Sequence, residues 1–138
     1  GAVHLATNAN RTLSDYFASA RYEGRPSVAT MANAMDVGDP SNAERLRWLY
    51  PDIEALRAVV GAETVDDPTI AARIREGESR YGQVWCPHTA CAVEVLQRRR
   101  AAGDVSPLCV VATAHPAKFE SVVEPLVGHP VALPPARV

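Results

Sequence analysis

Apolar residues recur along most of this chain with the three- and four-residue spacing of a helix that buries one face. Between these stretches lie Gly-, Pro- and Asn-containing segments that favour turns and loops. The pattern predicts six helices, over residues 12–21, 41–50, 51–60, 67–81, 89–102 and 116–124. A chain with this content is helix-rich, and most of its core has to come from amphipathic helices.

Local signals place the beginnings of several of these helices. Thr12 with Asp15, and Ser41 with Glu44, have the spacing of a capping box, in which a hydroxyl and a carboxylate bind the first backbone N–H groups. The glycine at position 77 costs about 1 kcal/mol relative to alanine inside a helix. We therefore expect a close packing contact at Gly77.

Two short runs are typical of β-strands. Val3–Thr7 is a mixed apolar run, and Leu108–Thr113 is apolar almost throughout, as expected of a buried parallel strand. Residues 25–40 lack a period and are predicted to form a long ordered loop with a helical turn near residues 29–34. The order of elements predicts an α/β fold with a parallel sheet, although two strands make only a remnant of a larger layer.

The amino-acid composition argues against several classes of function. Of the 138 residues, 47% are hydrophobic and 22% are charged, and the net charge of −2 gives no basic surface for nucleic acid. No apolar run approaches the length of a membrane span, and no secretory signal is apparent. The three cysteines favour the reducing cytoplasm over a disulfide framework. Cys86, His88 and Cys91 lack the paired spacing of a zinc site, so we expect no metal.

The beginning of the sequence predicts a piece of a longer protein. An apolar run starts almost directly after Gly1, and no initiator methionine precedes it. We interpret Gly1 as a cleavage scar. An apolar surface exposed at such a cut would favour self-association.

Four blocks of sequence resemble threonine synthases. They are ATNAN at residues 6–10, RPSVATMANAMDVGDPSN at 25–42, PHTA at 87–90 and ATAHPAKF at 112–119. The blocks follow the order of that family and extend over most of the chain. Two positions depart from the family pattern: Arg11 stands where aspartate is common, and Cys86 where an acidic residue is usual.

The resemblance implies a pyridoxal 5'-phosphate (PLP) lyase of the tryptophan-synthase-β-like fold. Such an enzyme converts O-phospho-L-homoserine and water to L-threonine and phosphate, with PLP as the electron sink. Residues 1–138 would be one C-terminal segment of the PLP domain, and the catalytic lysine and Gly-rich phosphate loop would lie upstream. We therefore expect the chain alone to be inactive and its main partner to be the remainder of the enzyme.

Few residues of this chain are candidates for direct contacts with cofactor or substrate. Lys118, the only lysine, follows Pro116 in an apparent first helical turn and is interpreted as structural. By resemblance, the hydroxyl of Thr113 would meet the pyridine nitrogen of PLP. His115 could approach the cofactor or could instead bind the start of the following helix. No catalytic residue is assigned within the chain.

The polar loop offers the second group of candidates. Asn33 and Asp36, with Asp39 and Asn42 nearby, could line or close the mouth of the active site. The same residue types favour Asx-turns and caps without any functional role. Two other functions also stay open: a non-catalytic interaction module, and a related PLP-dependent lyase that acts on another amino acid.

Overall fold

The computed structural model describes residues 2–133 and divides the chain into two compact units, with the boundary between Asp67 and Pro68. The prediction for Gly1 lies outside the described residues. The predicted fold class is confirmed, because the structure is helix-rich and contains a small parallel sheet.

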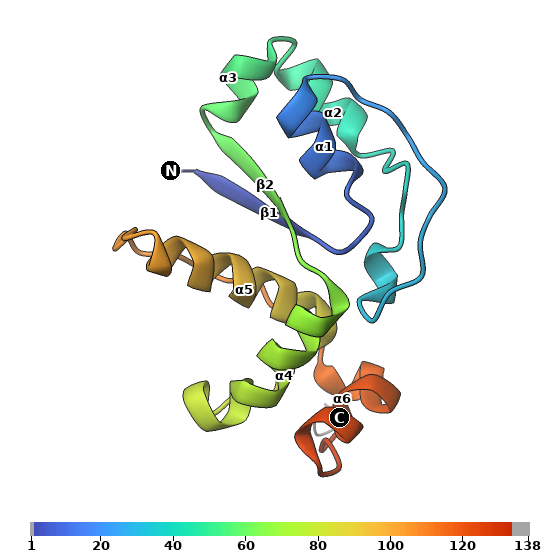
Figure 1. Ribbon diagram of the computed structural model, residues 1–138, viewed down its shortest axis with the longest axis vertical. Helices are drawn as coiled ribbons and strands as arrows, with labels where there is room; N and C mark the ends of the chain where they lie inside the picture. Colours follow the sequence, from blue (N-terminus) through green and yellow to red (C-terminus); the bar gives the residue numbers. More distant parts are fainter. Residues whose placement is uncertain (1, 134–138) are drawn as a thin grey trace, which may run out of the picture. The chain divides into compact units, whose positions relative to one another are not determined.

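The first unit is built around two parallel strands, β1 and β2 (Figure 1). Their register runs from Val3 opposite Val60 to Thr7 opposite Thr64. The connection between them contains a 3-10 turn and three helices. In chain order the elements are β1 (Val3–Thr7), α1 (Thr12–Ser19), η1 (Asn33–Met35), α2 (Ala43–Leu49), α3 (Ile53–Arg57) and β2 (Val60–Thr64).

The core of the first unit lies where α1 and α3 pack on the strands, and Figure 1 shows the three helices gathered on one side of the sheet. Its buried centre consists of Tyr16, Phe17, Leu56 and Val60. The ring of Tyr16 makes edge-on contacts with Phe17 and with Tyr22, each with centroids 5.8 Å apart. Burial of these large side chains is the main source of stability for a sheet of only two strands.

The strand β2 corrects a prediction. Val60 and Gly61 were expected to end a helix, but they begin β2, and α3 ends at Arg57. The apolar run that includes Val59 and Val60 fits either a helix or a strand by periodicity alone. The pairing with β1 decides the outcome, because it satisfies the backbone groups of residues 60–64.

Both predicted capping boxes are also wrong. Arg11 and Asn42 occupy the N-cap positions of α1 and α2, and neither side chain makes a capping hydrogen bond. The hydroxyl of Thr12 donates instead to the carbonyl of Gly38, at 2.6 Å. Asp15 binds two guanidinium groups, those of Arg11 and Arg25. The hydroxyl of Thr12 thus binds a distant residue, Gly38, and does not cap the helix that it begins.

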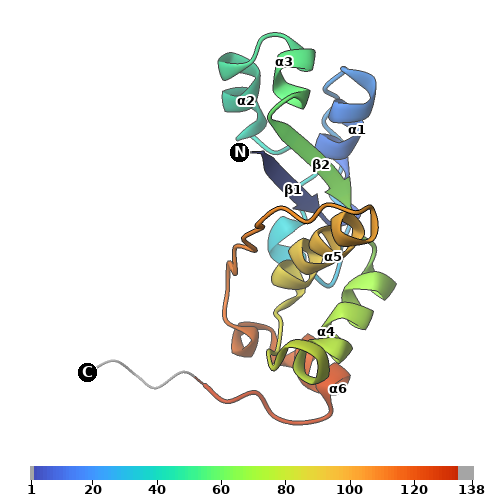
Figure 2. The same ribbon diagram turned by 90° about the vertical axis from the view of Figure 1, so that its left-hand side faces the viewer.

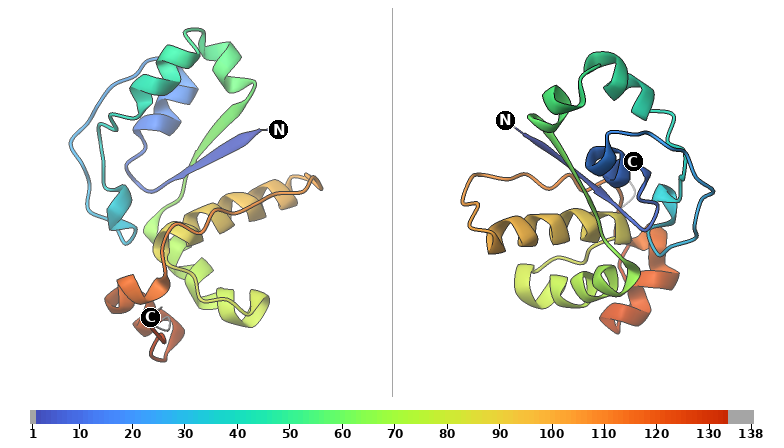
Figure 3. Two further views of the ribbon diagram at one scale, coloured as in Figure 1. Left: turned by 180° about the vertical axis from the view of Figure 1, so that it is seen from behind. Right: turned by 45° about the horizontal axis from the view of Figure 1, so that its top comes forward.

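The second unit consists of helices and the segments that join them, drawn from yellow-green to red in Figure 2 and in Figure 3. Helix α4 (Asp67–Tyr81) leads to α5 (Pro87–Ala101), and an extended segment then reaches η2 (Pro116–Phe119) and α6 (Glu120–Val127). Arg73 of α4 forms ion pairs with Glu76 and with Glu94 of α5, and Gln97 donates to Glu76. These contacts join α4 to α5 at their partly buried faces.

Gly77 makes the close contact that its position in a helix predicts. A Cβ atom added at this residue would lie 2.5 Å from the indole of Trp85 and 2.6 Å from the carbonyl oxygen of Gln83. The chain therefore folds back against α4 directly after Tyr81, and only glycine leaves room for Trp85 there. The prediction is confirmed.

Residues Leu108–Thr113 do not form the predicted strand. They run as an extended segment, and no strand of residues 2–133 pairs with them. An apolar sequence can adopt the extended conformation, but a strand also needs a neighbour that completes its hydrogen bonds. The helix predicted at Pro116 is present, first as η2 and then as α6, and it includes Pro125.

His129 links the segment after α6 to the end of α4, and this contact predicts a pH effect. Its Nε2 lies 2.8 Å from a carboxylate oxygen of Glu78, and its Nδ1 lies 3.0 Å from the carbonyl of Pro130. Because both ring nitrogens face acceptors, the imidazolium fits best. The Pro130 carbonyl first, and then Glu78, raise the pKa of His129 above its usual 6.5.

A raised folded-state pKa stabilises the protein fully below pH 6.5, and this stabilisation is lost as the pH rises through the folded value. Glu78→Gln is expected to lower the pKa of His129, measured by NMR of the ring protons. Glu124→Gln is the matched control and should have a smaller effect, because Glu124 is the weakest of the influences on His129. An unchanged titration in Glu78→Gln would contradict this account.

Within residues 2–133, no helix combines the length and the apolar character needed to cross a membrane. In the same range no three His, Cys, Asp or Glu side chains could together hold a metal ion. The thiols of Cys86 and Cys91 are buried and that of Cys109 is exposed, and none of the three forms a disulfide bond. Cys86 is the N-cap of α5, where its sulfur accepts from the backbone N–H of Thr89.

Candidate functional site at the carboxyl ends of the strands

The carboxyl ends of β1 and β2 lie at the same edge of the sheet, which is the edge where open α/β folds gather their ligand contacts. Three hydroxyl groups meet there. The Oγ1 atoms of Thr7 and Thr64 are 3.2 Å apart, and Ser14 of α1 lies 3.3 Å from Thr7 and 2.9 Å from Thr64. The edge is thus polar although the neighbouring core is apolar.

Asn8, directly after β1, is fully buried. Its Oδ1 accepts from the backbone N–H and from the side chain of Asn10, at 2.9 and 3.1 Å. Its Nδ2 faces three acceptors: Oγ1 of Thr30, the carbonyl of Ala32 and Oδ1 of Asp36. Asn8 therefore ties the end of the strand to the loop of residues 25–39.

Asn10 also joins the end of β1 to the loop, through the backbone of Val28. Its Oδ1 accepts from the backbone N–H of Val28, and its Nδ2 donates to the carbonyl of the same residue, both at 2.8 Å. A side-chain amide here pairs with the backbone in the way that a neighbouring strand would. The loop is held beside the sheet by this contact.

The carboxylate of Asp36 completes the network. It accepts from the backbone N–H and the hydroxyl of Thr30, at 2.9 and 2.7 Å, and from the side chains of Asn8 and Asn10. Hydrogen bonds of this number allow an ionised carboxylate to lie partly buried. The geometry assigns Asp36 a role in fixing the loop, whereas its neighbour Asn33 is exposed on η1.

The structure brings Asp36, one of the four predicted loop residues, together with residues that were not candidates. Asn33 and Asp36 share one short turn, in which the carbonyl of Asn33 accepts from the backbone N–H of Asp36 at 3.1 Å. Asn8, Asn10 and Thr30 were not candidates. The sequence signals for them are the Asn-Ala-Asn run at the end of a predicted strand and the two blocks, residues 6–10 and 25–42, that resemble threonine synthases.

The other predicted residues lie in the second unit. Thr113 and His115 are both exposed, on the extended segment before η2. His115 is the N-cap of η2, where its Nδ1 accepts from the backbone N–H of Ala117 at 3.2 Å. This is the helix-start role that was the alternative for His115.

Comparison with known proteins shows which proteins the chain is similar to. A family model described as "Threonine synthase, C-terminal" matches residues 89–137. The threonine synthase of Serratia marcescens is 34% identical over 131 residues, which cover 95% of this chain and 30% of the relative. The chain matches the C-terminal part of threonine synthases. The Escherichia coli enzyme is 33% identical over 94% of this chain and 29% of its own length.

Solved threonine synthase structures agree with the sequence comparison. The structure of PLP-bound threonine synthase from Brucella melitensis has a TM-score of 0.85 and is 30% identical, and the match covers 97% of this chain and 34% of that one. The structure of the Escherichia coli enzyme has a TM-score of 0.77 and is 30% identical, and the match covers 97% of this chain and 31% of that one. The chain thus spans about a third of the length of the threonine synthases it matches.

The residues of this chain do not by themselves fit PLP. A lysine that holds PLP needs a buried or electropositive setting, but Lys118 is exposed on η2. The eight glycines are scattered singly and form no phosphate-binding loop.

Proposed function

We propose that this chain supplies the C-terminal part of a threonine synthase that converts O-phospho-L-homoserine and water to L-threonine and phosphate. The observation that carries the proposal is the similarity to threonine synthases over 95% of the chain. The remainder of such an enzyme, about two thirds of its length, would supply the lysine that holds PLP. The chain alone would then be inactive.

The contribution of the first unit would be to build one wall of the active site. Asn8, Asn10 and Asp36 hold the loop against the carboxyl ends of the strands. We propose that Asp36 acts by positioning the loop and that Asn33, whose side chain is exposed, contacts the substrate or closes the site. Thr113 and His115 are the proposed cofactor contacts of the second unit.

The outer sides of β1 and β2 support the proposal of a larger partner. Within residues 2–133 each strand has one neighbour, so its other edge presents backbone donors and acceptors that a further strand can pair with. The remainder of the enzyme would extend the sheet at these edges. We propose a cytoplasmic location for the assembled enzyme, because the three cysteines form no disulfide bond and the cytoplasm keeps thiols reduced.

The test is a chimera in which this chain replaces the matching segment of the Serratia marcescens enzyme. The chimera is expected to release phosphate from O-phospho-L-homoserine, and the 138-residue chain alone is expected to release none. Turnover by the isolated chain would overturn the proposal, as would a folded, PLP-binding chimera without activity. A chimera that prefers another phospho- or hydroxy-amino acid would instead identify a related lyase.

Within the chimera, Thr113→Val tests the cofactor contact. Loss of the hydroxyl is expected to lower kcat and to shift the absorbance band of the bound cofactor. Thr69→Val on α4 is the matched control and should change neither. An unchanged spectrum in Thr113→Val would remove Thr113 from the site.

A further inference from the structure

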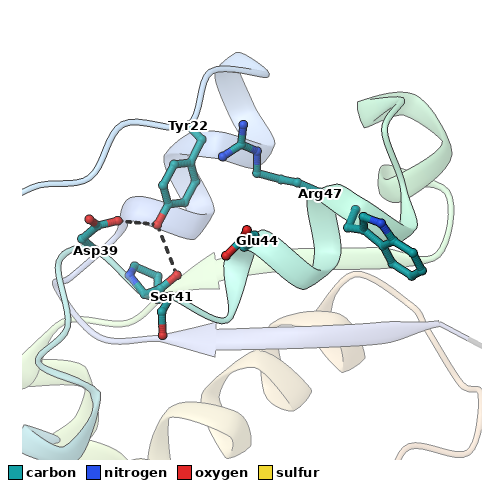
Figure 4. Close-up of a pocket in the computed structure, with 7 residues that line it drawn as sticks. Tyr22, Asp39, Ser41, Glu44 and Arg47 are labelled. Atoms are coloured by element: carbon teal, nitrogen blue, oxygen red, sulfur yellow. Dashed lines mark hydrogen bonds between the residues drawn. The ribbon is translucent and has the colours of Figure 1, made fainter.

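A cavity of the first unit lies between α2 and the segment that follows α1. It has a volume of about 450 Å³, which lies within the range of roughly 300–1,000 Å³ found for small-molecule sites. Its walls come from the segment after α1, from residues 39–41 and from α2 (Figure 4). The lining residues are Tyr22, Asp39, Pro40, Ser41, Glu44, Arg47 and Trp48.

One wall of this cavity is held in place by hydrogen bonds. The hydroxyl of Tyr22 donates to Oδ1 of Asp39 at 2.8 Å and also lies 3.3 Å from the carbonyl of Pro40. Burial first, and then Asp39, raise the pKa of Tyr22 to about 12, so the hydroxyl keeps its proton. The carboxyl group of Asp39 packs against Gly24. A Cβ atom added at Gly24 would lie 2.6 Å from the carboxyl carbon of Asp39. The wall is therefore formed before any ligand binds.

The opposite wall presents two unlike charges. Glu44 and Arg47 are three residues apart on α2, a spacing at which such residues usually pair, as Glu54 with Arg57 does in this chain. Within the described part of the chain, neither Glu44 nor Arg47 forms an ion pair. The guanidinium carbon of Arg47 lies instead 5.4 Å from the ring centroid of Tyr22. Both charges thus face the cavity (Figure 4).

An apolar surface completes the cavity. The side chain of Trp48 is 78% exposed, an unusual setting for the largest apolar residue. Its indole offers a flat face for an apolar group of a ligand. The cavity therefore combines a carboxylate, a guanidinium and an aromatic wall.

We propose that this cavity binds a zwitterionic α-amino acid with an apolar side chain. Arg47 would bind the α-carboxylate, Glu44 the α-ammonium group, and Trp48 the side chain. A simple cation is disfavoured because Arg47 repels it, and a simple anion because Asp39 and Glu44 repel it. The proposal does not rest on the catalytic function, since it shares no residue with the network of Asn8, Asn10 and Asp36.

The test is titration of the 138-residue chain with L-leucine, followed by calorimetry and by the fluorescence of Trp48 in a Trp85→Phe background. L-leucine is expected to bind saturably. L-leucinamide, which lacks the carboxylate, and N-acetyl-L-leucine, which lacks the ammonium group, should each bind at least about tenfold more weakly, because each loses one charge-assisted hydrogen bond. No saturable binding of L-leucine, or equal binding of all three compounds, would overturn the proposal.

Variants of residues on α2 distinguish binding in the cavity from non-specific attraction to surface charge. Arg47→Gln and Glu44→Gln are each expected to weaken L-leucine binding about tenfold. Arg47→Lys keeps the charge and should retain most of the affinity. Arg45→Gln removes the same charge from a residue of α2 that does not line the cavity, and it should have no effect. Equal losses in Arg45→Gln and Arg47→Gln would show attraction to net charge only and would also overturn the proposal.

Discussion

Replacing Asn8 by alanine is expected to lower the free energy of unfolding by about 3 kcal/mol. The side chain of Asn8 is 0% exposed and takes part in hydrogen bonds with Asn10, Thr30, Ala32 and Asp36. Its removal takes the acceptor from the buried backbone N–H of Asn10 and a donor from Ala32 and Asp36, and an unsatisfied buried group costs about 1–3 kcal/mol. Urea denaturation followed by circular dichroism measures the change.

The control for this prediction is Asn33→Ala in the same loop. Asn33 has the same side chain but is exposed on η1, so its replacement should change stability by no more than about 0.5 kcal/mol. Equal effects of the two substitutions would contradict the view that Asn8 holds the loop. In the chimera, by contrast, Asn33→Ala is the variant expected to raise KM.

Gly38→Ala is expected to destabilise the protein by a similar amount, about 3 kcal/mol. An added Cβ would lie 2.1 Å from the carbonyl oxygen of Arg25 and 2.8 Å from the carbonyl carbon of Pro26. Both are backbone atoms, so no side chain can rotate away. The carbonyl of Gly38 also accepts from Thr12 and from the backbone N–H of Arg25, and a shift would weaken both hydrogen bonds.

Gly61→Ala is the matched control, because it adds the same methyl group within the same unit. Its new Cβ would lie 3.1 Å from the imidazole of His4, a side chain that can move by a few tenths of an ångström. We expect a change below about 1 kcal/mol, measured by the same denaturation. If Gly38→Ala were as mild as Gly61→Ala, the loop would not be packed as closely as described.

Local features of the fold could be predicted from the sequence wherever neighbouring residues decide them. The strand Val3–Thr7 and the long helices α4 and α5 follow from periodicity and from Pro and Gly signals. Prediction failed where a contact with a distant residue determines the local structure. The hydroxyl of Thr12 binds Gly38, so it does not cap α1, and Val60 pairs with Val3, so it does not extend α3.

The candidate site shows the same division. Residues of the polar loop were predicted to line or close the mouth of the active site, and that role stays a prediction. The network that holds the loop could not be predicted, because Asn8 and Asp36 meet across 28 positions. Asparagine and aspartate favour turns intrinsically, so nothing in their type distinguishes a long-range contact from a local one.

The parallel pairing of β1 with β2 has a consequence for biosynthesis. Thr7 and its partner Thr64 are 57 positions apart, so β1 leaves the ribosome well before the strand that pairs with it. At about 5–20 residues per second, the nascent chain carries an unpaired strand for several seconds. Chaperones that bind extended apolar segments therefore have time to act on residues 3–7, and synonymous codons that slow translation after β1 should increase aggregation.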